Sequence, residues 1–119
     1  MAQAATDLYG LDRKLATTLF GDPTAYGGEI VAATWYGNEL RGSRTASGEW
    51  FDPDGLTAAH RSLPFGTCLL VGNPKTGRTV VVRVNDRGPF TEGMTLDLSA
   101  GAARAIGMRS TQKVSMKRC

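Results

Sequence analysis

The sequence predicts a single small domain of the mainly β class, with one or two short helices and an N-terminal extension. Its 119 residues, 41% of them hydrophobic, suffice for one hydrophobic core and leave little room for a second. Glycine contributes 15 residues, well above its usual share of about 7%, which favours tight turns over long helices. Short apolar runs separated by turn residues are typical of a small barrel or sandwich.

Residues 1–28 differ from the rest of the chain. Leucine recurs at every fourth position between residues 11 and 20, which predicts a short amphipathic helix. The sequence Gly21-Asp22-Pro23 ends that helix, and a linker follows as far as residue 28. The β-rich domain is therefore expected to cover residues 29–119.

Six segments of this domain are predicted to be strands because apolar and β-branched residues alternate or cluster in them. They cover residues 30–36, 56–60, 67–71, 79–85, 94–98 and 113–119. The run 79–85 contains four valines and is predicted to be a central strand. Ser99 is expected to cap an alanine-rich helix over residues 100–106, which Gly107 closes.

Cysteine is present only at positions 68 and 119, and His60 is the single histidine. These residues cannot build the usual tetrahedral zinc site, so we expect no metal and no cofactor. In an exported protein, Cys68 and Cys119 predict one disulfide, worth about 4 kcal/mol in the chain-entropy model. The alternative is two free thiols in a cytosolic protein. A disulfide would require the strands that carry the two cysteines to be neighbours.

The net charge of +3 is mild and scattered. It suits an anionic polymer such as bacterial wall glycan, or solubility alone, and does not predict a nucleic-acid partner. No run of 18 apolar residues predicts a membrane span. The segment Ala2-Gln3-Ala4 has the small-x-small form of a signal cleavage site. We therefore expect an exported, monomeric protein of the periplasm or cell envelope, whose signal peptide is absent from this sequence.

Three polar residues are candidates for chemistry. Asp86 follows the valine-rich strand where the chain leaves the core, and partial burial there would suit a general acid. The alternative is a turn former, because Asn-Asp-Arg-Gly is favourable turn chemistry. Glu49 precedes two aromatic residues, which is typical of a site wall but also of an ordinary loop. His60 ends a predicted strand and could equally be a plain buried histidine.

Two adjacent aromatic residues end the first predicted strand. The rings of Trp35 and Tyr36 could stack on the apolar faces of sugars. Neighbouring side chains of a strand point to opposite faces, so we expect one ring inside the domain and the other outside.

Several motifs occur together in one order. They are Trp35-Tyr36-Gly37, Thr45-Ala46-x-Gly48-Glu49-x-Phe51-Asp52, Leu56-Thr57-Ala58-Ala59-His60, Leu63-Pro64-Phe65-Gly66-Thr67, Val84-Asn85-Asp86-Arg87-Gly88-Pro89-Phe90 and Leu96-Asp97-Leu98-Ser99. Over residues 29–119 this string resembles the rare lipoprotein A (RlpA) domain. The resemblance implies a six-stranded double-psi β-barrel, shared with expansins, and a bacterial envelope protein that acts on peptidoglycan.

Characterised RlpA enzymes are lytic transglycosylases, which cleave MurNAc–GlcNAc bonds of peptide-free glycan and leave 1,6-anhydro-MurNAc ends. The resemblance places the family's functional residues at Glu49, Asp52, His60 and Asp86, and an expansin aspartate at Asp97. We expect Asp86 and Glu49 to act as acid and base, and His60 to orient one of them. The residues expected to bind substrate are Asp52, Asp97, Arg87, Asn85, Trp35 and Tyr36.

Arg87 and the cysteine pair each allow two interpretations. Arg87 could contact a carboxylate or acetamido group of the substrate, or pair with an acid of the site. The cysteine pair is absent from many RlpA domains and resembles the disulfide-rich expansins. The alternative function is therefore a non-catalytic, expansin-like module that binds wall glycan.

Overall fold

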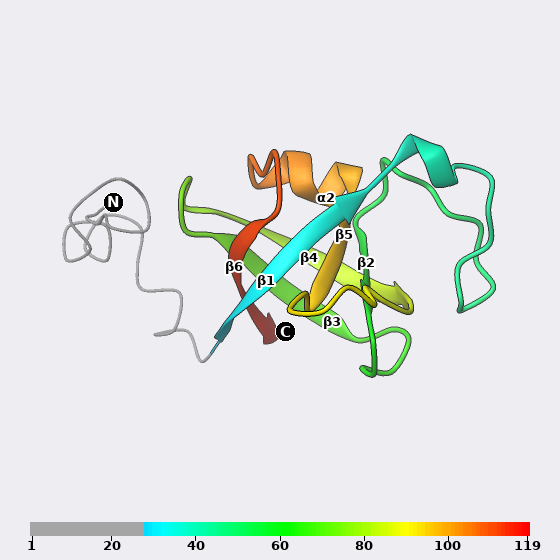
Figure 1. Cartoon of the computed structure of the whole chain (residues 1–119), viewed down its shortest axis with the longest axis horizontal. Helices are drawn as coiled ribbons and strands as arrows, with labels where there is room; N and C mark the ends of the chain where they lie inside the picture. Colours follow the sequence, from blue (N-terminus) through cyan, green and yellow to red (C-terminus); the bar gives the residue numbers. More distant parts are fainter. Residues whose placement is uncertain (1–27) are drawn as a thin grey trace.

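The computed structural model describes residues 28–119, and the helix predicted over residues 11–20 lies outside this part. Six strands form a closed barrel in the order β1-β5-β2-β4-β3-β6 (Figure 1). The strands are β1 (Glu29–Tyr36), β2 (Thr57–His60), β3 (Cys68–Asn73), β4 (Arg78–Asp86), β5 (Leu96–Ser99) and β6 (Gln112–Arg118). All six predicted strands are confirmed, with ends that differ by a few residues.

The barrel is mixed, because β1 pairs with β5 and β2 with β4 in parallel, whereas the other neighbours are antiparallel. The predicted valine-rich strand becomes β4, the longest of the six, which pairs with β2 and β3. Closure leaves no unpaired sheet edge, which suits a small domain.

The core lies inside the barrel and consists of aliphatic side chains from all six strands. The largest fully buried members are Leu69, Leu96, Leu98, Ile106, Val71, Val82, Val84 and Val114. The helix α2 (Ala100–Ala105) packs on β4, β5 and β1 with its buried alanines. Ser99 caps it by accepting a hydrogen bond from the Ala102 amide, and Gly107 follows it with a positive φ of 70°, as predicted.

The disulfide between Cys68 and Cys119 is present and joins the start of β3 to the end of the chain. β3 and β6 are hydrogen-bonded neighbours, as the predicted disulfide requires. In the described part of the chain, neither cysteine is free. No helix within residues 28–119 has the length and apolar character needed to cross a membrane.

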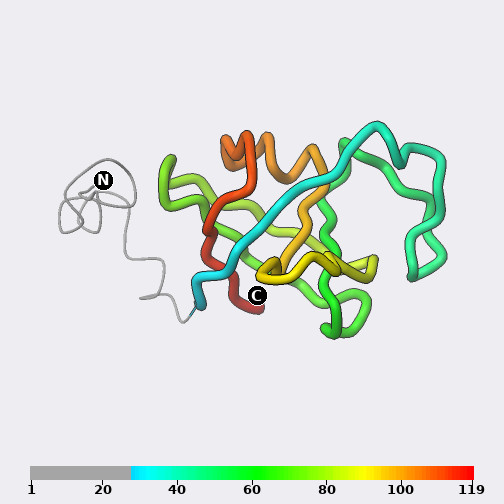
Figure 2. The backbone as a smooth tube through the Cα atoms, in the orientation of Figure 1, coloured from blue at the N-terminus to red at the C-terminus, as the bar shows by residue number. Residues whose placement is uncertain are grey.

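The connection between β1 and β2 is the longest in the domain and projects from one end of the barrel, past the short 3-10 helix η3 (Asn38–Leu40) (Figure 2). Its tip is a small hairpin over residues 44–50, which returns to the end of β4 through a hydrogen bond from the Ser47 amide to the Asn85 carbonyl, 3.2 Å. The connection also brings Phe51 against the barrel. It thereby covers the strand ends that carry most of the predicted site residues.

Candidate functional site

Two aspartates lie on the outer face of the barrel, on either side of one alanine. Ala59 of β2 is in register with Asp97 of β5 on one side and with Asp86 of β4 on the other. Leu96 and Leu98 point into the core, so the side chain of Asp97 points outward. Neighbouring strands lie about 4.8 Å apart, which puts the two aspartate Cα atoms roughly 10 Å from each other. We call Asp86 and Asp97 the aspartate pair.

A β-bulge turns Asp86 toward this face. Ala58 pairs with Val84, but the next residue, Ala59, pairs with Asp86, so that Asn85 is the extra residue of β4. In an uninterrupted strand Asp86 would share the inward face of Val84, whose side chain is fully buried in the core. Bulges re-aim side chains in this way, often beside active sites.

A small aromatic cluster covers the surface beside the aspartate pair. The rings of Tyr36 and Phe51 stack at 4.7 Å between centroids, and both residues are buried together with Ala59 in a group separate from the barrel core. This apolar cover excludes water from one side of the site, which penalises a charged carboxylate.

Asp97 is a half-buried acid on β5. Burial raises its pKa from 3.8 to about 7, and the negative charges of Asp86 and Glu39 add to the effect. Its Oδ1 atom is buried without a hydrogen-bond partner. Such a carboxyl holds a proton near neutral pH, as a general acid must.

Asp86 has the opposite surroundings, because hydrogen-bond donors surround its carboxylate. Oδ1 accepts bonds from the Ala46 amide at 2.8 Å and from the Arg87 amide at 2.9 Å. The Tyr36 hydroxyl lies 3.5 Å from Oδ2. Burial and the two aspartate charges raise the pKa of Tyr36 well above its ordinary value, so the phenol stays protonated. The two amide bonds fix the orientation of the Asp86 carboxylate.

The 44–50 hairpin supplies the Ala46 amide. Arg44 and Trp50 form an antiparallel bridge, and the Thr45 amide donates to the Glu49 carbonyl at 2.8 Å. A further bond from the Gly48 amide to the Thr45 carbonyl, 2.9 Å, closes a four-residue turn, and Gly48 adopts a φ of 94°. This is a three-residue hairpin loop in which glycine takes the left-handed position. The motif from Thr45 to Glu49 is therefore turn chemistry that places one N–H at Asp86.

Glu49 lies at the surface and forms an ion pair with Arg83 of β4. Asn85 donates a second bond to it at 3.3 Å. The bonds from Arg83 and Asn85 hold the pKa of Glu49 below its ordinary value. These contacts favour a permanently ionised Glu49 that anchors the hairpin, and they do not favour a proton donor. The bulge residue Asn85 links this ion pair to β4, and its predicted role in substrate binding stays a prediction.

His60 ends β2, as predicted, and its ring forms hydrogen bonds with the backbone that directly follows this strand. Its Nδ1 atom accepts bonds from the amides of Ser62 and Leu63, both at 3.1 Å. Burial, helped by the charges of Arg61 and Arg87, lowers the pKa of the imidazole, which favours the neutral ring. Within residues 28–119 His60 makes no hydrogen bond to either Asp86 or Glu49, so the expected orienting bond is not formed here.

Asp52 and Arg87 also have structural partners. Asp52 accepts a bond from the Asp54 amide at 3.0 Å, which fixes the turn that precedes β2. Arg87 donates to the carbonyls of His60, 3.1 Å, and Leu63, 2.8 Å, and stacks on the Phe65 ring. Its guanidinium therefore pairs with carbonyl groups in this structure and with no acid of the described residues.

The two aromatic residues at the end of β1 divide as predicted. Tyr36 is 7% exposed, whereas Trp35 is 40% exposed. The indole of Trp35 donates to the Arg109 carbonyl at 3.0 Å, which fixes its orientation. Tyr36 stacks on Phe51 and donates toward Asp86, so its ring is not free to bind a sugar face.

Sequence reasoning missed three features of this surface. The bulge at Asn85 has no sequence signal of its own. Arg83 lies within the valine-rich run, where no motif indicates that it pairs with Glu49. Arg44 stacks over the ring of Trp50, and no motif indicates this contact either. In the part of the chain that the structure describes, no group of three or more His, Cys, Asp or Glu residues could hold a metal ion.

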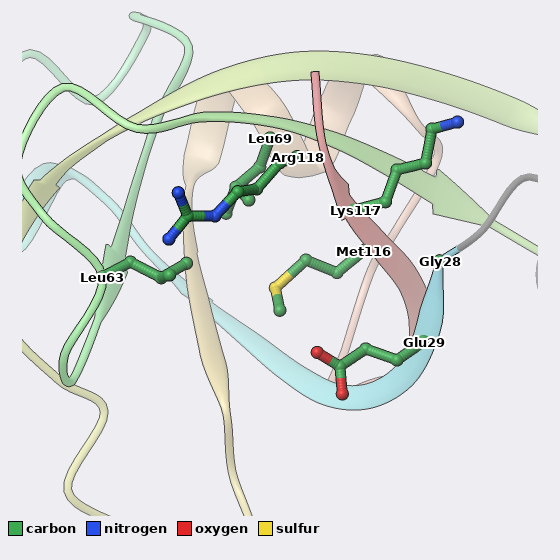
Figure 3. Close-up of a pocket in the computed structure, with 7 residues that line it drawn as sticks. All are labelled: Gly28, Glu29, Leu63, Leu69, Met116, Lys117 and Arg118. Atoms are coloured by element: carbon green, nitrogen blue, oxygen red, sulfur yellow. The ribbon is translucent and has the colours of Figure 1, made fainter.

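A pocket of about 290 Å³ lies elsewhere, beside the start of β1 and the end of β6 (Figure 3). Its lining residues are Gly28, Glu29, Leu63, Leu69, Met116, Lys117 and Arg118. None of them belongs to the aspartate pair or to the 44–50 hairpin. The candidate site described above therefore lies outside this pocket.

Comparison with known proteins identifies the family. The sequence model of the double-psi β-barrel family described as lytic transglycolase matches residues 29–117. The chain belongs to this RlpA-like family. The family resemblance and the barrel expected from the sequence are therefore confirmed.

Curated relatives of this RlpA-like domain carry one name. The protein of Synechocystis sp. named "Probable endolytic peptidoglycan transglycosylase RlpA" is 62% identical over 79 residues, which are 66% of this chain and 25% of that protein. The "Endolytic peptidoglycan transglycosylase RlpA" of Yersinia pestis is 49% identical over 88 residues, 74% of this chain and 24% of that protein. The chain thus spans about a quarter of these relatives' length.

Solved structures show the same barrel in another kind of protein. The expansin of Clavibacter michiganensis superposes with a TM-score of 0.63 at 27% identity, over 77% of this chain and 50% of the expansin. A variant of that expansin, with one aspartate changed to asparagine and cellohexaose bound, gives a TM-score of 0.60 at 27% identity, with the same shares covered. The RlpA-like domain therefore shares its barrel with a carbohydrate-binding neighbour.

Proposed function

We propose that this RlpA-like domain is a lytic transglycosylase that cleaves MurNAc–GlcNAc bonds in peptidoglycan strands, with the aspartate pair as acid and base. The observation that carries the proposal is Asp97, whose burial raises its pKa to about 7 beside the hydrogen-bonded Asp86. Two carboxyl groups with different surroundings can hold one proton between them at neutral pH. The names of the curated relatives support the same reaction.

The reaction needs one proton donor and one proton acceptor. Asp97 gives its proton to the bridging oxygen as the C1–O4 bond breaks, and positive charge develops on the MurNAc ring. The C6 hydroxyl of the same MurNAc bonds to C1, and Asp86 takes the hydroxyl proton. Transfer of that proton from Asp86 to Asp97 restores the starting state, so neither water nor a cofactor is consumed.

This assignment changes two roles expected from the sequence. Asp86, expected to be either the acid or the base beside Glu49, takes the role of base. Asp97, expected to bind substrate, becomes the proton donor, and Glu49 does not, because the bonds from Arg83 hold the pKa of Glu49 below its ordinary value. Glu49 becomes a positioning residue that holds the hairpin on β4. His60 orders the chain that follows β2.

Substrate and location follow from the reaction. A domain that cuts peptidoglycan must act where that polymer lies, which places this protein outside the cytoplasm, in the periplasm or cell envelope. The disulfide between Cys68 and Cys119 supports an oxidising compartment.

A second candidate function is a wall-binding module that holds glycan without cutting it. The observation in its favour is the structural similarity to an expansin, including the variant with cellohexaose bound. A binding module has no need of a protonated acid at neutral pH, so Asp97 favours the enzyme.

The deciding experiment incubates the wild type, Asp97→Asn, Asp86→Asn and Glu49→Gln with intact and with amidase-stripped peptidoglycan. Mass spectrometry of the released sugars then identifies the chain ends. We expect 1,6-anhydro-MurNAc products from the wild type and none from the two aspartate variants. Reducing ends would indicate a hydrolase, and sedimentation with the glycan without release of sugar would indicate the binding module.

A further inference from the structure

The 44–50 hairpin carries an exposed aromatic and cationic pair that the proposed reaction does not use. Trp50 is 62% exposed, and the guanidinium carbon of Arg44 lies 4.0 Å from the centre of its ring. Both residues belong to the antiparallel bridge that closes the hairpin. We call these two side chains the Arg44–Trp50 platform.

The charge of Arg44 lacks a counter-charge within residues 28–119. Its guanidinium donates to the Gly48 carbonyl at 2.9 Å, and no carboxylate of the described residues pairs with it. The neighbouring Glu49 is engaged by Arg83. Stacking on an indole fixes an arginine while leaving N–H groups at its edge for a further acceptor.

The platform adjoins the proposed reaction centre. The Ala46 amide, two residues beyond Arg44, donates to Asp86 at 2.8 Å. Two residues of extended chain span at most about 7 Å, so the Cα atom of Arg44 lies within about 10 Å of the Asp86 carboxylate. The ion pair between Glu49 and Arg83 joins the other arm of the hairpin to β4, the strand that ends at Asp86.

We infer that the Arg44–Trp50 platform is a glycan subsite that recognises a sugar bearing a free carboxylate, as the lactyl group of peptide-free MurNAc does. This inference rests on the proposed function and names two residues that would determine its substrate specificity. The open indole face would bind the C–H face of a pyranose, and the arginine would pair with the carboxylate in bidentate geometry. A stem peptide converts that carboxylate into a neutral amide, so the platform would favour stripped strands.

A binding experiment separates the two parts of the platform. Peptide-free GlcNAc–MurNAc oligosaccharide and its lactyl-methylamide derivative are titrated by calorimetry, with Asp97→Asn as the parent so that no sugar is cleaved. Arg44→Gln, Arg44→Lys and Trp50→Ala are compared in that parent. Phe90→Ala is the matched control, since Phe90 is 78% exposed on the connection after β4.

We expect the parent to bind the acid about tenfold or more tightly than the amide, since hydrogen bonds to charged groups are strong. Arg44→Gln should remove this preference, Arg44→Lys should keep part of it, and Trp50→Ala should weaken both ligands equally. Phe90→Ala should change neither. Circular dichroism confirms that each variant is folded.

Three results would overturn the subsite: an unchanged acid preference in Arg44→Gln, the parent's affinity in Trp50→Ala, or no binding of either probe by the parent. These results differ from a failure of the proposed function. If the parent binds the acid through Arg44 but the wild type releases no anhydro sugar, the subsite stands and the lytic activity fails. If the wild type releases anhydro sugar but the parent shows no acid preference, only the subsite fails.

Discussion

The aspartate pair and the 44–50 hairpin both present acidic side chains beside the end of β4, yet they suit different tasks. Asp97 is half-buried on a barrel strand, has a pKa near 7, and has one oxygen without a partner. Glu49 projects from a loop, pairs with Arg83, and has a lowered pKa. Burial on a rigid strand therefore produces a proton donor, and an exposed ion pair on a loop produces an anchor.

The largest expected effect comes from removing the buried acid. Asp97→Asn keeps the shape of the side chain but cannot donate a carboxyl proton, so release of anhydro-MurNAc should fall by about 10²–10⁴-fold. Rates are measured on stripped peptidoglycan, with thermal unfolding as the control for folding. A variant that is folded and nearly as active as the wild type would remove Asp97 from the mechanism.

The pH dependence of the rate tests whether Asp97 is the proton donor. The active enzyme holds a proton on Asp97, whose pKa is raised to about 7, so activity should decline as pH rises above 7. The decline should approach about tenfold per pH unit where this proton alone limits the rate. The measurement is the initial rate between pH 5 and 9 with the ionic strength held constant. A rate that stays level to pH 9 would contradict the assignment.

We expect the 44–50 hairpin to contribute to catalysis through one hydrogen bond, from the Ala46 amide to Asp86. Ala46 occupies the second position of the turn that Thr45 and Gly48 close, where proline is well tolerated. Ala46→Pro therefore deletes the donor to Asp86 while keeping the turn. A hydrogen bond to a charged group contributes about 1.5–3 kcal/mol, so we expect the rate to fall by about ten- to a hundredfold.

Ala46→Gly is the matched control, because it changes the side chain and keeps the N–H. It should retain most of the activity. Equal losses in the proline and glycine variants would show that the hairpin acts through its packing and not through this bond.

The raised pKa of Asp97 should also make the stability of the domain depend on pH, with a smaller effect than on the rate. The pKa of Asp97 is about 7 in the folded protein and 3.8 in the absence of structure, so between these values the folded state binds more protons than the unfolded state. The contribution of Asp97 to stability is therefore most favourable below pH 4 and is lost as pH rises to 7. Thermal unfolding from pH 4 to 8 should show Asp97→Asn gaining stability relative to the wild type with rising pH. A constant difference would contradict the raised pKa.

The contrast between the two regions also explains what the sequence could predict. Alternating and β-branched residues identify all six strands, and Ser99 and Gly107 identify the ends of α2, because these signals are local. The disulfide was predictable once both cysteines fell on strand ends. The site depends on register, which is not local: the bulge at Asn85 decides that Asp86 faces outward beside Ala59.

The roles of the acids were harder to predict for the same reason. The resemblance to the family indicated Asp86, Glu49 and Asp97 as candidates, but not which of them would be buried. Only the packed structure places Tyr36 and Phe51 against Ala59, the residue between the two aspartates, and Arg83 beside Glu49. A pKa depends on these neighbours, which come from distant parts of the chain. The assignment of donor and anchor therefore required the fold.

The smallest expected effect is that of Glu49→Gln on stability and on the pH profile. The substitution removes the negative charge but retains an oxygen that can accept from Arg83 and Asn85. An exposed ion pair contributes about 0.2–1 kcal/mol, so the free energy of unfolding should fall by less than about 1 kcal/mol. The pH at which activity begins to decline should stay where it is in the wild type, because Asp97 still supplies the proton. The opposite result would be a loss of the decline in activity above pH 7 in Glu49→Gln, with that decline kept in Asp97→Asn. Glu49 would then be the proton donor and Asp97 would not. An exposed side chain of this barrel could therefore act as the acid.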